Sequence, residues 1–365
     1  MIDDIPTHGG QLRQISERFG IPVSQLTDFS ANINPDGPSP AIVAALRASL
    51  EDASTLMAYP DLEEVELKRA IAAYAGVSPG NVAVANGFVP LLEAALRTLK
   101  IKRCLLPVPA FAEYRHSLSR LSIQVRPQVL TPNSIFCYDI DALLEGDHDA
   151  ILIANPQNPS GVLTSHEKLL RLVFRCAERG IAVLLDEAFI DYAPAASLTK
   201  IASQNLKVIV FRSVTKFHGT PGLRVAYAVA DETTARSLNH QLPPWPITTM
   251  ASIAAVAALS DSNFEERTRL HNNLRESRLR AALTELGIYV YPSAANFLLL
   301  RLPVAINATV LWQRMIVEHH LVLRDCSNYE ALPPGHLRLA IRTQKENERL
   351  IASIHLALKP LITSR

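Results

Sequence analysis

Apolar runs of strand length alternate along this chain with amphipathic helical stretches, and several of the runs end in polar residues. Three of them are residues 150–154, 181–185 and 208–211, which are followed by Asn155, Asp186 and Arg212-Ser213. Buried strands that alternate with helices predict an α/β fold. Because the carboxyl ends of such strands line the ligand crevice of an open sheet, we expect Asn155, Asp186 and Ser213 to converge there.

The pattern of expected helices and strands changes after about residue 250. Long helical stretches are followed there by short strand-like runs and a terminal helix, which is typical of a smaller α+β unit. We expect helices near residues 249–260, 263–286 and 344–358. The predicted division is an N-terminal segment that packs with the small domain, a large domain and a small C-terminal domain, covering residues 1–30, 31–248 and 249–365.

The charge composition argues against a large polyanionic partner. The chain has 36 Lys and Arg residues against 35 Asp and Glu residues, so it lacks the basic excess that nucleic acid or an anionic membrane selects. Only nine of those 36 residues are lysines, and arginine is the residue that binds carboxylates and phosphates in a bidentate way. This balance favours a small anionic substrate.

Cysteine usage and the N-terminus indicate a cytoplasmic protein. The cysteines are widely spaced and form no CxxC pair, which predicts neither a disulfide framework nor a metal site. The chain opens with Asp3 and Asp4, where a signal peptide would carry basic residues. No apolar stretch approaches the roughly 18 residues of a membrane span, so we expect no membrane partner.

The segment from Ser213 to Arg224 places Lys216 just past a buried strand. Dinucleotide, P-loop, hydrolase-elbow and zincin motifs are absent from the sequence. Burial and nearby cations lower the pKa of a lysine, which suits imine formation, while Ser213 and Arg224 could hold a phosphate. Taken alone, however, the segment is more typical of a lysine in a surface loop.

The other predicted strand ends supply groups that complement this lysine. A buried carboxylate at Asp186 needs a cation, and a protonated pyridine nitrogen would provide one. Asn155 could donate to a ring oxygen, and the Asn86-Gly87 turn would offer backbone N–H groups and a helix N-terminus to a phosphate. Together with a lysine that can react with an aldehyde, these groups match the ring nitrogen, ring hydroxyl, phosphate and aldehyde of pyridoxal 5′-phosphate. This cofactor acts as an electron sink.

Three motifs in a fixed order carry a resemblance to a known family: Asn155-Pro-Gln-Asn-Pro-Ser-Gly161, Asp186-Glu-Ala-Phe-Ile-Asp191 and Ser213-Val-Thr-Lys-Phe217. From His8 to about Arg342 the sequence resembles the fold-type-I aminotransferase superfamily (class I/II). Within it, the chain is most similar to the L-threonine-O-3-phosphate decarboxylases of cobalamin biosynthesis, with histidinol-phosphate aminotransferases as near relatives. The resemblance implies an α/β large domain, with a mostly parallel seven-stranded sheet between helices, and a smaller α+β domain.

The resemblance also implies a complete pyridoxal-phosphate site. Lys216 is similar to the imine-forming and proton-transferring lysine, Asp186 to the partner of the pyridine nitrogen, and Asn155 to the residue that bonds the ring oxygen. Phe111 is similar to the aromatic residue that stacks on the ring. The residues that match the phosphate cradle are Gly87, Phe88, Ser213 and Arg224. Tyr59 is similar to a tyrosine that binds the phosphate in the neighbouring subunit, which implies a homodimer with shared active sites.

Two positions depart from the pattern of the relatives. Pro90 stands three places after Gly87, where relatives commonly carry an acidic residue, and proline has no N–H to give to a phosphate. Phe189 stands where many histidinol-phosphate aminotransferases have a tyrosine that bonds the ring oxygen. The second departure favours the decarboxylases, which often have phenylalanine there.

The substrate end of the site also rests on the resemblance. The opening His8-Gly9-Gly10 and the stretch around Asn32 match segments of the decarboxylases, and an imidazole with glycine amides can close over a phosphate monoester. Without the resemblance, a histidine in an N-terminal tail is usually exposed, and arginines on a β face usually form surface ion pairs. The implied substrate contacts are His8, Gly9, Asn32 and Asn155, with Arg338 as carboxylate anchor and Arg324 as phosphate contact.

The expected activity is decarboxylation of O-phospho-L-threonine to (R)-1-amino-2-propanol O-2-phosphate in cobalamin biosynthesis. The alternatives are transamination of histidinol phosphate with 2-oxoglutarate, decarboxylation of O-phospho-L-serine, and a non-catalytic module that binds pyridoxal phosphate or a partner. The orientation of the substrate carboxylate decides between the two reactions. The two phosphoamino acids differ by a single methyl group, and a pocket distinguishes two substrates that differ in this way by only about 1–3 kcal/mol of binding free energy.

Overall fold

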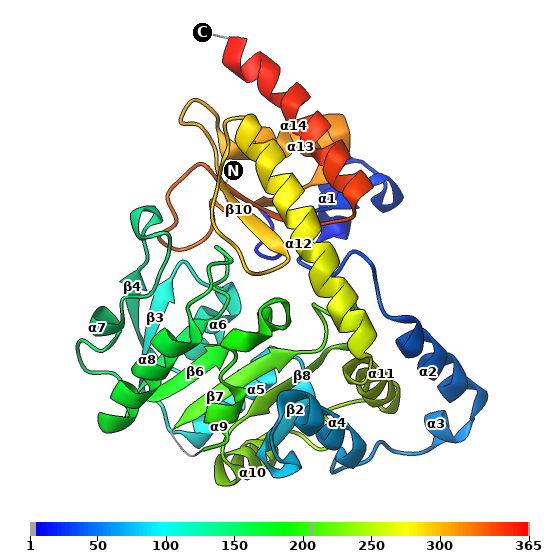
Figure 1. The fold of residues 1–365 in the computed structure, drawn as a ribbon, viewed down its shortest axis with the longest axis vertical. Helices are drawn as coiled ribbons and strands as arrows, with labels where there is room; N and C mark the ends of the chain where they lie inside the picture. The colour runs from blue at the N-terminus through cyan, green and yellow to red at the C-terminus, as the bar shows by residue number, and fades with distance from the viewer. Residues whose placement is uncertain (1–4, 205–206, 364–365) are drawn as a thin grey trace.

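A computed structural model describes residues 5–204 and 207–363 (Figure 1). The large sheet, in the lower part of Figure 1, contains β2 (Val82–Asn86), β3 (Arg103–Val108), β4 (Gln124–Val129), β5 (Ala150–Ala154), β6 (Ala182–Asp186), β7 (Val208–Ser213) and β8 (Val225–Val229). The strand order is β2-β8-β7-β6-β5-β3-β4. Strand β8 runs antiparallel to both of its neighbours, and the other pairings are parallel. The expected α/β fold with a mostly parallel seven-stranded sheet is confirmed.

Helices cover both faces of this sheet, which explains why its strands are near-continuous apolar runs. Alternate residues of β2 show the two faces: Val82 and Val84 belong to one apolar cluster, while Ala83 and Ala85 belong to another. The first cluster includes side chains of α2 (Pro40–Glu51), α4 (Val65–Ala75), α8 (His166–Glu178), α9 (Thr199–Ala202) and α11 (Thr249–Leu259). The second includes side chains of α5 (Phe88–Thr98), α6 (Ala112–Arg120) and α10 (Glu232–Gln241).

A smaller antiparallel sheet forms the upper part of the molecule in Figure 1. Its strand order is β12 (Arg324–Asp325), β13 (His336–Ala340), β10 (Phe297–Arg301) and β9 (Tyr289–Val290). Helices α12 (Ser262–Glu285), α13 (Ala308–His319) and α14 (Gln344–Thr363) pack beside it. The long helix α12 runs from the region of α11 up to the small sheet, so it connects the two parts (Figure 1).

The N-terminal segment packs with the small sheet rather than with the large one. Helix α1 (Leu12–Phe19) contributes Ile15 to the apolar cluster around β10 and α13. Strand β1 (Thr27–Asp28) pairs in parallel with β11 (Leu321–Val322). Helix α11, which the sequence assigns to the small domain, packs against α2 and α4 beside the large sheet. The three domain limits therefore stay a prediction.

The remaining elements are short. Among the described residues, no helix is both long enough and apolar enough to cross a membrane. The short helices are α3 (Ser54–Met57) and α7 (Ile140–Leu143), and the 3₁₀ turns are η1 (Val23–Gln25), η2 (Pro79–Asn81), η3 (Pro132–Ser134), η4 (Ile190–Tyr192), η5 (Pro194–Ala196) and η6 (Pro221–Leu223).

Candidate active site

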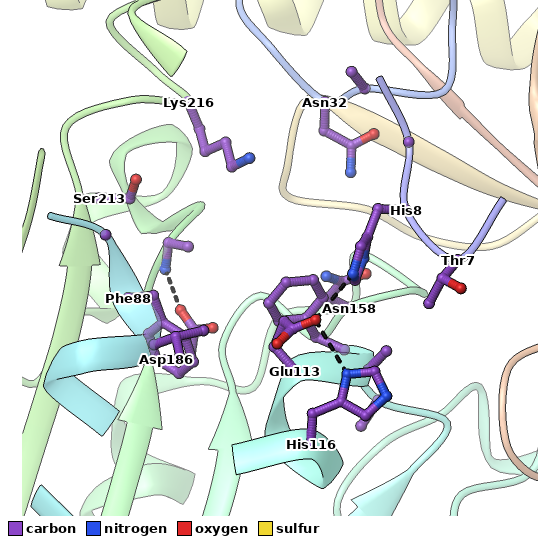
Figure 2. Close-up of a pocket in the computed structure, with 18 of the residues that line it drawn as sticks. Thr7, His8, Asn32, Phe88, Glu113, His116, Asn158, Asp186, Ser213 and Lys216 are labelled. Carbon is purple, nitrogen blue, oxygen red and sulfur yellow. Dashed lines mark hydrogen bonds and ion pairs between the residues drawn. The ribbon is translucent and has the colours of Figure 1, made fainter. Parts of the chain in front are cut away.

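A cavity of about 660 Å³ lies where the carboxyl ends of β6 and β7 meet the small sheet and the N-terminal segment. Figure 2 shows Lys216 and Asp186 on one side of this cavity and His8 and Asn32 on the other. All but two of the residues predicted for the site line it: His8, Gly9, Asn32, Gly87, Phe88, Phe111, Asp186, Ser213, Lys216, Arg224, Arg324 and Arg338. The two exceptions are Asn155 and Tyr59.

Lys216 follows β7 and carries the amine of the site. Burial, together with the positive charges of Arg224 and Arg338, lowers the pKa of Lys216 to about 8, and the negative charge of Asp186 acts in the opposite direction. An amine with this pKa exchanges protons readily near neutral pH and holds a larger nucleophilic fraction than an ordinary lysine. The predicted surface-loop alternative therefore does not apply.

Asp186 ends β6 with its side chain 8% exposed. Burial raises the pKa of this carboxyl group, while two hydrogen-bond donors and the charge of Lys216 act in the opposite direction. The donors are the Tyr114 hydroxyl, 2.5 Å from Oδ2, and the Ala188 backbone N–H, 2.9 Å from Oδ1. A protonated ring nitrogen would supply the cation that such a buried carboxylate needs.

A cradle for an anion forms where β2 passes into α5. Gly87 precedes α5 with φ +97°, a conformation that favours glycine, and a Cβ there would lie 2.9 Å from Nη2 of Arg224. The free N–H groups at the start of α5 and the guanidinium of Arg224 both favour an anion. Ser213 adds a hydroxyl that lies 2.6 Å from Oγ1 of Thr215. Pro90 lies within the first turn of α5, so the cradle depends on the residues before it.

Asn155 does not reach the cavity. Its side chain is fully buried, with Oδ1 accepting from the Thr164 N–H at 2.8 Å and Nδ2 donating to the Thr164 carbonyl at 3.1 Å. Three residues later, Asn158 lines the cavity, and its Oδ1 accepts a hydrogen bond from Nη1 of Arg338 at 2.7 Å. Asn158 therefore lines the cavity, whereas the predicted Asn155 does not.

Tyr59 also lies away from the cavity of its own chain. Its side chain is 81% exposed and stacks on Trp245, with 4.8 Å between the ring centroids. Met57 and Leu56 beside it are also exposed. A contact between Tyr59 and a cofactor phosphate therefore requires the cavity of a second chain.

The substrate side of the cavity contains two buried arginines that are held by different partners. Arg338 donates to Asn158, to the Tyr329 hydroxyl and to the Ser30 carbonyl. Arg324 donates to the Thr7 carbonyl at 2.8 Å and to Asn328 Oδ1 at 2.6 Å, so it also fixes the N-terminal segment. Two separately anchored guanidinium groups can hold two anionic groups of one ligand.

The N-terminal segment closes one wall of the cavity. His8 Nε2 lies 3.0 Å from Glu113 Oε1, and the His8 ring lies 5.6 Å from the Phe111 ring. His116 binds the same carboxylate oxygen at 3.2 Å, as Figure 2 shows. These two histidines lower the pKa of Glu113, although burial of the carboxyl group acts in the opposite direction.

Sequence reasoning missed several residues that shape the site. Asn158 stands in the same motif as Asn155, three residues later. Tyr114 lies one helical turn after Phe111, and that spacing could have been noticed. Asn34 binds the backbone of Lys216 and Phe217 across the fold, and no local pattern signals such a contact.

The residues present fit pyridoxal 5′-phosphate. A lysine with a lowered pKa, a buried carboxylate, an anion cradle and the Phe111 ring surround one cavity. In addition, Oδ1 of Asn32 and Nε of Arg338 are buried without a hydrogen-bond partner among the described residues. Such unpaired groups are costly in a closed protein interior, but they are expected where a polar ligand binds.

Comparison with known proteins identifies the family. The model of aminotransferase class I and II matches residues 24–354. A threonine-phosphate decarboxylase of Salmonella typhimurium is 33% identical over 353 residues, which cover 95% of each chain. The histidinol-phosphate aminotransferase of Clostridium acetobutylicum has a TM-score of 0.83 at 26% identity, covering 90% of this chain and 97% of that one.

A further solved structure has the same fold. The histidinol-phosphate aminotransferase of Sinorhizobium meliloti, solved in complex with pyridoxal-5′-phosphate, has a TM-score of 0.85 at 20% identity and covers 96% of this chain and 95% of that one. The family and the cofactor that the motifs predict are confirmed. This chain belongs to the class I and II aminotransferases, a family of pyridoxal-phosphate-dependent enzymes.

Proposed function

We propose that this enzyme decarboxylates O-phospho-L-threonine to (R)-1-amino-2-propanol O-2-phosphate in cobalamin biosynthesis. The observation that carries the proposal is the pair Arg324 and Arg338, two buried guanidinium groups that line one cavity from separate anchors. A substrate with both a carboxylate and a phosphate matches them. The full-length similarity to a threonine-phosphate decarboxylase supports the same substrate class.

The cofactor would be held by the residues that line the sheet side of the cavity. Lys216 would offer its amine, Asp186 would pair with the ring nitrogen, and Asn158 would take the ring-oxygen role that the motifs predict for Asn155. Phe111 would stack on the ring. The phosphate cradle consists of the N–H groups of Gly87 and Phe88 with the side chains of Ser213 and Arg224. When bound, the cofactor supplies an electron sink for the pair of electrons left on Cα.

Lys216 also holds the proton that the reaction needs at Cα. A pKa of about 8 lets this amine donate a proton to a carbanion-like centre and take one up again near neutral pH. Decarboxylation breaks the bond between Cα and the carboxylate, whereas transamination breaks the Cα–H bond, so the residues that orient the carboxylate decide between the two reactions. Arg338 and Asn32 would hold the carboxylate, because both contribute polar groups to the cavity wall, and Figure 2 shows Asn32 across the cavity from Lys216.

Arg324, with His8 and the Gly9 amide, binds the substrate phosphate. These groups come from β12 and the N-terminal segment, and the contact between Arg324 and the Thr7 carbonyl holds them together. A Cβ on Gly9 would meet the Ser30 carbonyl oxygen at 2.0 Å, so glycine is required for this close packing. The N-terminal segment thereby becomes part of the substrate site.

Phe189 favours this proposal over transamination of histidinol phosphate. It lines the cavity beside Asp186 and packs edge-on against Phe297, with 5.0 Å between the ring centroids. Phenylalanine cannot bond a ring oxygen, in contrast to the tyrosine of many histidinol-phosphate aminotransferases. Transamination of histidinol phosphate is the second candidate, because the chain is similar over most of its length to the Clostridium acetobutylicum enzyme.

We further propose a cytoplasmic homodimer. The exposed apolar side chains of Leu56, Met57 and Tyr59, with Trp245 stacked on Tyr59, form a surface that a second copy would cover. In such a dimer Tyr59 would contribute to the partner's phosphate cradle. The four cysteines are all free, which fits a reducing compartment.

The deciding experiment supplies O-phospho-L-threonine to the holoenzyme without any keto acid. Release of carbon dioxide together with the amine phosphate supports the proposal. A parallel assay with O-phospho-L-serine measures how strongly the enzyme prefers the substrate that carries the extra methyl group. Glutamate formed only from histidinol phosphate and 2-oxoglutarate, with no carbon dioxide from either phosphoamino acid, would overturn it in favour of the aminotransferase.

A further inference from the structure

Tyr114 is a buried tyrosine outside the cavity wall whose hydroxyl points at Asp186. The side chain is 2% exposed, and its hydroxyl donates to Oδ2 of Asp186 at 2.5 Å. Burial and the negative charge of Asp186 raise the pKa of Tyr114 well above its ordinary value, so the hydroxyl keeps its proton and acts as a donor. A buried, charge-assisted hydrogen bond of this kind is stronger than one between neutral groups.

We propose that Tyr114 is the positioning residue for the ring nitrogen of the cofactor, because its hydrogen bond to Oδ2 stabilises the carboxylate form of Asp186 and fixes the orientation of that carboxylate. The inference rests on the proposed role of Asp186 as the partner of that nitrogen. Tyr114 acts through Asp186 and does not line the cavity itself.

The two oxygens of Asp186 each accept one hydrogen bond. Tyr114 binds Oδ2, and the Ala188 backbone N–H binds Oδ1 at 2.9 Å. Donors on both oxygens define the plane of the carboxylate and offset the desolvation that would otherwise favour its protonated form. The Ala188 contact belongs to the turn after β6, whereas the Tyr114 contact comes from α6, so Tyr114 is the donor that links Asp186 to a separate element.

Tyr114 is held firmly enough to direct its hydroxyl. Its ring packs edge-on against Phe111 and tilted against Phe88, with 5.6 Å between the ring centroids in each case. Its backbone N–H donates to the Phe111 carbonyl at 3.0 Å, in the first turn of α6. One short stretch of chain therefore supplies both the ring-stacking residue and the group that orients the ring-nitrogen partner.

The other charged and titratable groups around Asp186 do not replace Tyr114. Lys216, after β7, lowers the pKa of Asp186 through its positive charge, but this effect disappears once the amine is neutral. Tyr138 is buried nearby, but its hydroxyl donates to the Ala154 carbonyl at 2.8 Å and accepts from the Ala154 N–H. Loss of the Tyr114 hydroxyl therefore leaves the side chain of Asp186 with one protein donor among the described residues.

The test compares two probes that differ only at the ring nitrogen. Apoenzyme is titrated with pyridoxal 5′-phosphate and with its 1-deaza analogue, which has a CH group in place of that nitrogen, and both affinities are measured for wild type and Tyr114→Phe. Wild type should prefer the natural cofactor. The variant should reduce this preference by about tenfold or more, the range for a hydrogen bond to a charged group.

Tyr138→Phe is the matched control, because it removes a buried tyrosine hydroxyl close to Asp186 without removing a donor to its carboxylate. Its preference for the natural cofactor should stay within about twofold of wild type, since Asp186 keeps both of its donors. As a second readout, the pH titration of the bound-cofactor absorbance should have its acidic limb at higher pH in Tyr114→Phe. The reason is that loss of the donor raises the pKa of Asp186.

Two outcomes would overturn the inference, and they are distinguishable. If Tyr114→Phe weakens both probes by the same factor and leaves the acidic limb unmoved, Tyr114 only packs, and the role of Asp186 stands. If wild type itself binds both probes equally, Asp186 is not the partner of the ring nitrogen, and the proposal for Tyr114 fails with that assignment. Neither result decides the reaction type, which the carbon dioxide assay tests separately.

Discussion

Nδ2 of Asn34 donates a hydrogen bond to the backbone carbonyl of Phe217, 2.9 Å away, although 183 residues separate them in the chain. The backbone N–H of Asn34 also donates to the carbonyl of Lys216 at 3.1 Å. Nearby, a Cβ on Gly219 would meet the backbone of Gly37 at 2.6 Å, so the two loops lie backbone against backbone. The segment that carries Asn32 is thereby fastened to the turn that carries the reactive lysine.

Asn34→Ala should lower the free energy of unfolding by about 1–3 kcal/mol, because the buried carbonyl of Phe217 loses its donor. The variant should also raise the pKa of Lys216, since a loosened turn lets water reach the amine. Urea denaturation of the apoenzyme measures the first effect, and the pH dependence of imine formation with pyridoxal measures the second.

Asn81→Ala is the control for this prediction. Nδ2 of Asn81 donates to the Ala230 carbonyl at 2.9 Å in an equally buried setting at the opposite end of β2 and β8. It should cost similar stability without changing the pKa of Lys216. An unchanged pKa of Lys216 in Asn34→Ala would show that Asn34 stabilises the fold without setting the environment of the amine.

Lys216 itself should make the stability of the apoenzyme depend on pH. Its pKa is about 8 in the folded protein, below the ordinary value of 10.5. The unfolded chain therefore binds more protons between these values, and stability rises with pH as the amine loses its proton. Below pH 8 the buried charge costs up to roughly 3 kcal/mol, the equivalent of the pKa difference.

Lys216→Met keeps the aliphatic stem and removes this charge. At pH 7 the apoenzyme variant should be more stable than wild type, and the difference should shrink as the pH rises from 8 towards 10. Lys345→Met, at an exposed lysine, should show no such trend. Parallel stability curves for wild type and Lys216→Met across this range would contradict the lowered pKa.

Asn158 and Asn155 should behave differently although both stand in one motif. Asn158→Ala should change the absorbance of the bound cofactor and reduce turnover, because it removes the only one of the two side chains that faces the cavity. Asn155→Ala should instead lower stability by about 1–3 kcal/mol, because the N–H and carbonyl of Thr164 lose their partner. Spectra of the holoenzymes and urea titrations measure the two effects, and a cofactor spectrum altered more by Asn155→Ala would reverse the assignment.

The positions of Asp186 and Ser213 were predictable because sheet geometry dictates them. Residues at the carboxyl ends of neighbouring parallel strands share one edge of the sheet, whatever the loops do. Asn155 also follows a strand end, and its backbone N–H donates to the Asp186 carbonyl at 2.9 Å. Its side chain, however, turns back onto its own loop, and the direction of a loop side chain is not encoded in strand periodicity.

The remaining features depend on long-range packing. The contact between Tyr114 and Asp186 joins α6 to β6, and the contact between Arg324 and Thr7 joins residues 317 positions apart. The family resemblance suggested that His8 approaches the substrate, but only the folded chain shows His8 beside Glu113 and His116. The proposed role of Tyr59 depends on a second copy of the chain.

Arg324 and Arg338 should contribute to substrate binding in separable ways. If Arg324 binds the phosphate, Arg324→Gln should weaken the binding of O-phospho-L-threonine by about 10- to 100-fold and leave the binding of L-threonine nearly unchanged. The reason is that a charge-assisted contact is lost only with the phosphorylated ligand. Arg338→Gln should weaken both ligands by a similar factor, since both carry the carboxylate. Dissociation constants come from the change in cofactor absorbance on titration of the holoenzyme.

The comparison of the two ligands guards against a general loosening of the site. Arg324 also holds the Thr7 carbonyl and Asn328, so its replacement could move the whole N-terminal segment. His8→Ala serves as the matched variant: it removes one predicted phosphate contact but leaves those anchors in place, and it should reduce the preference for O-phospho-L-threonine over L-threonine less than Arg324→Gln does. If Arg324→Gln weakens both ligands equally, Arg324 maintains the wall of the cavity and a different group binds the phosphate.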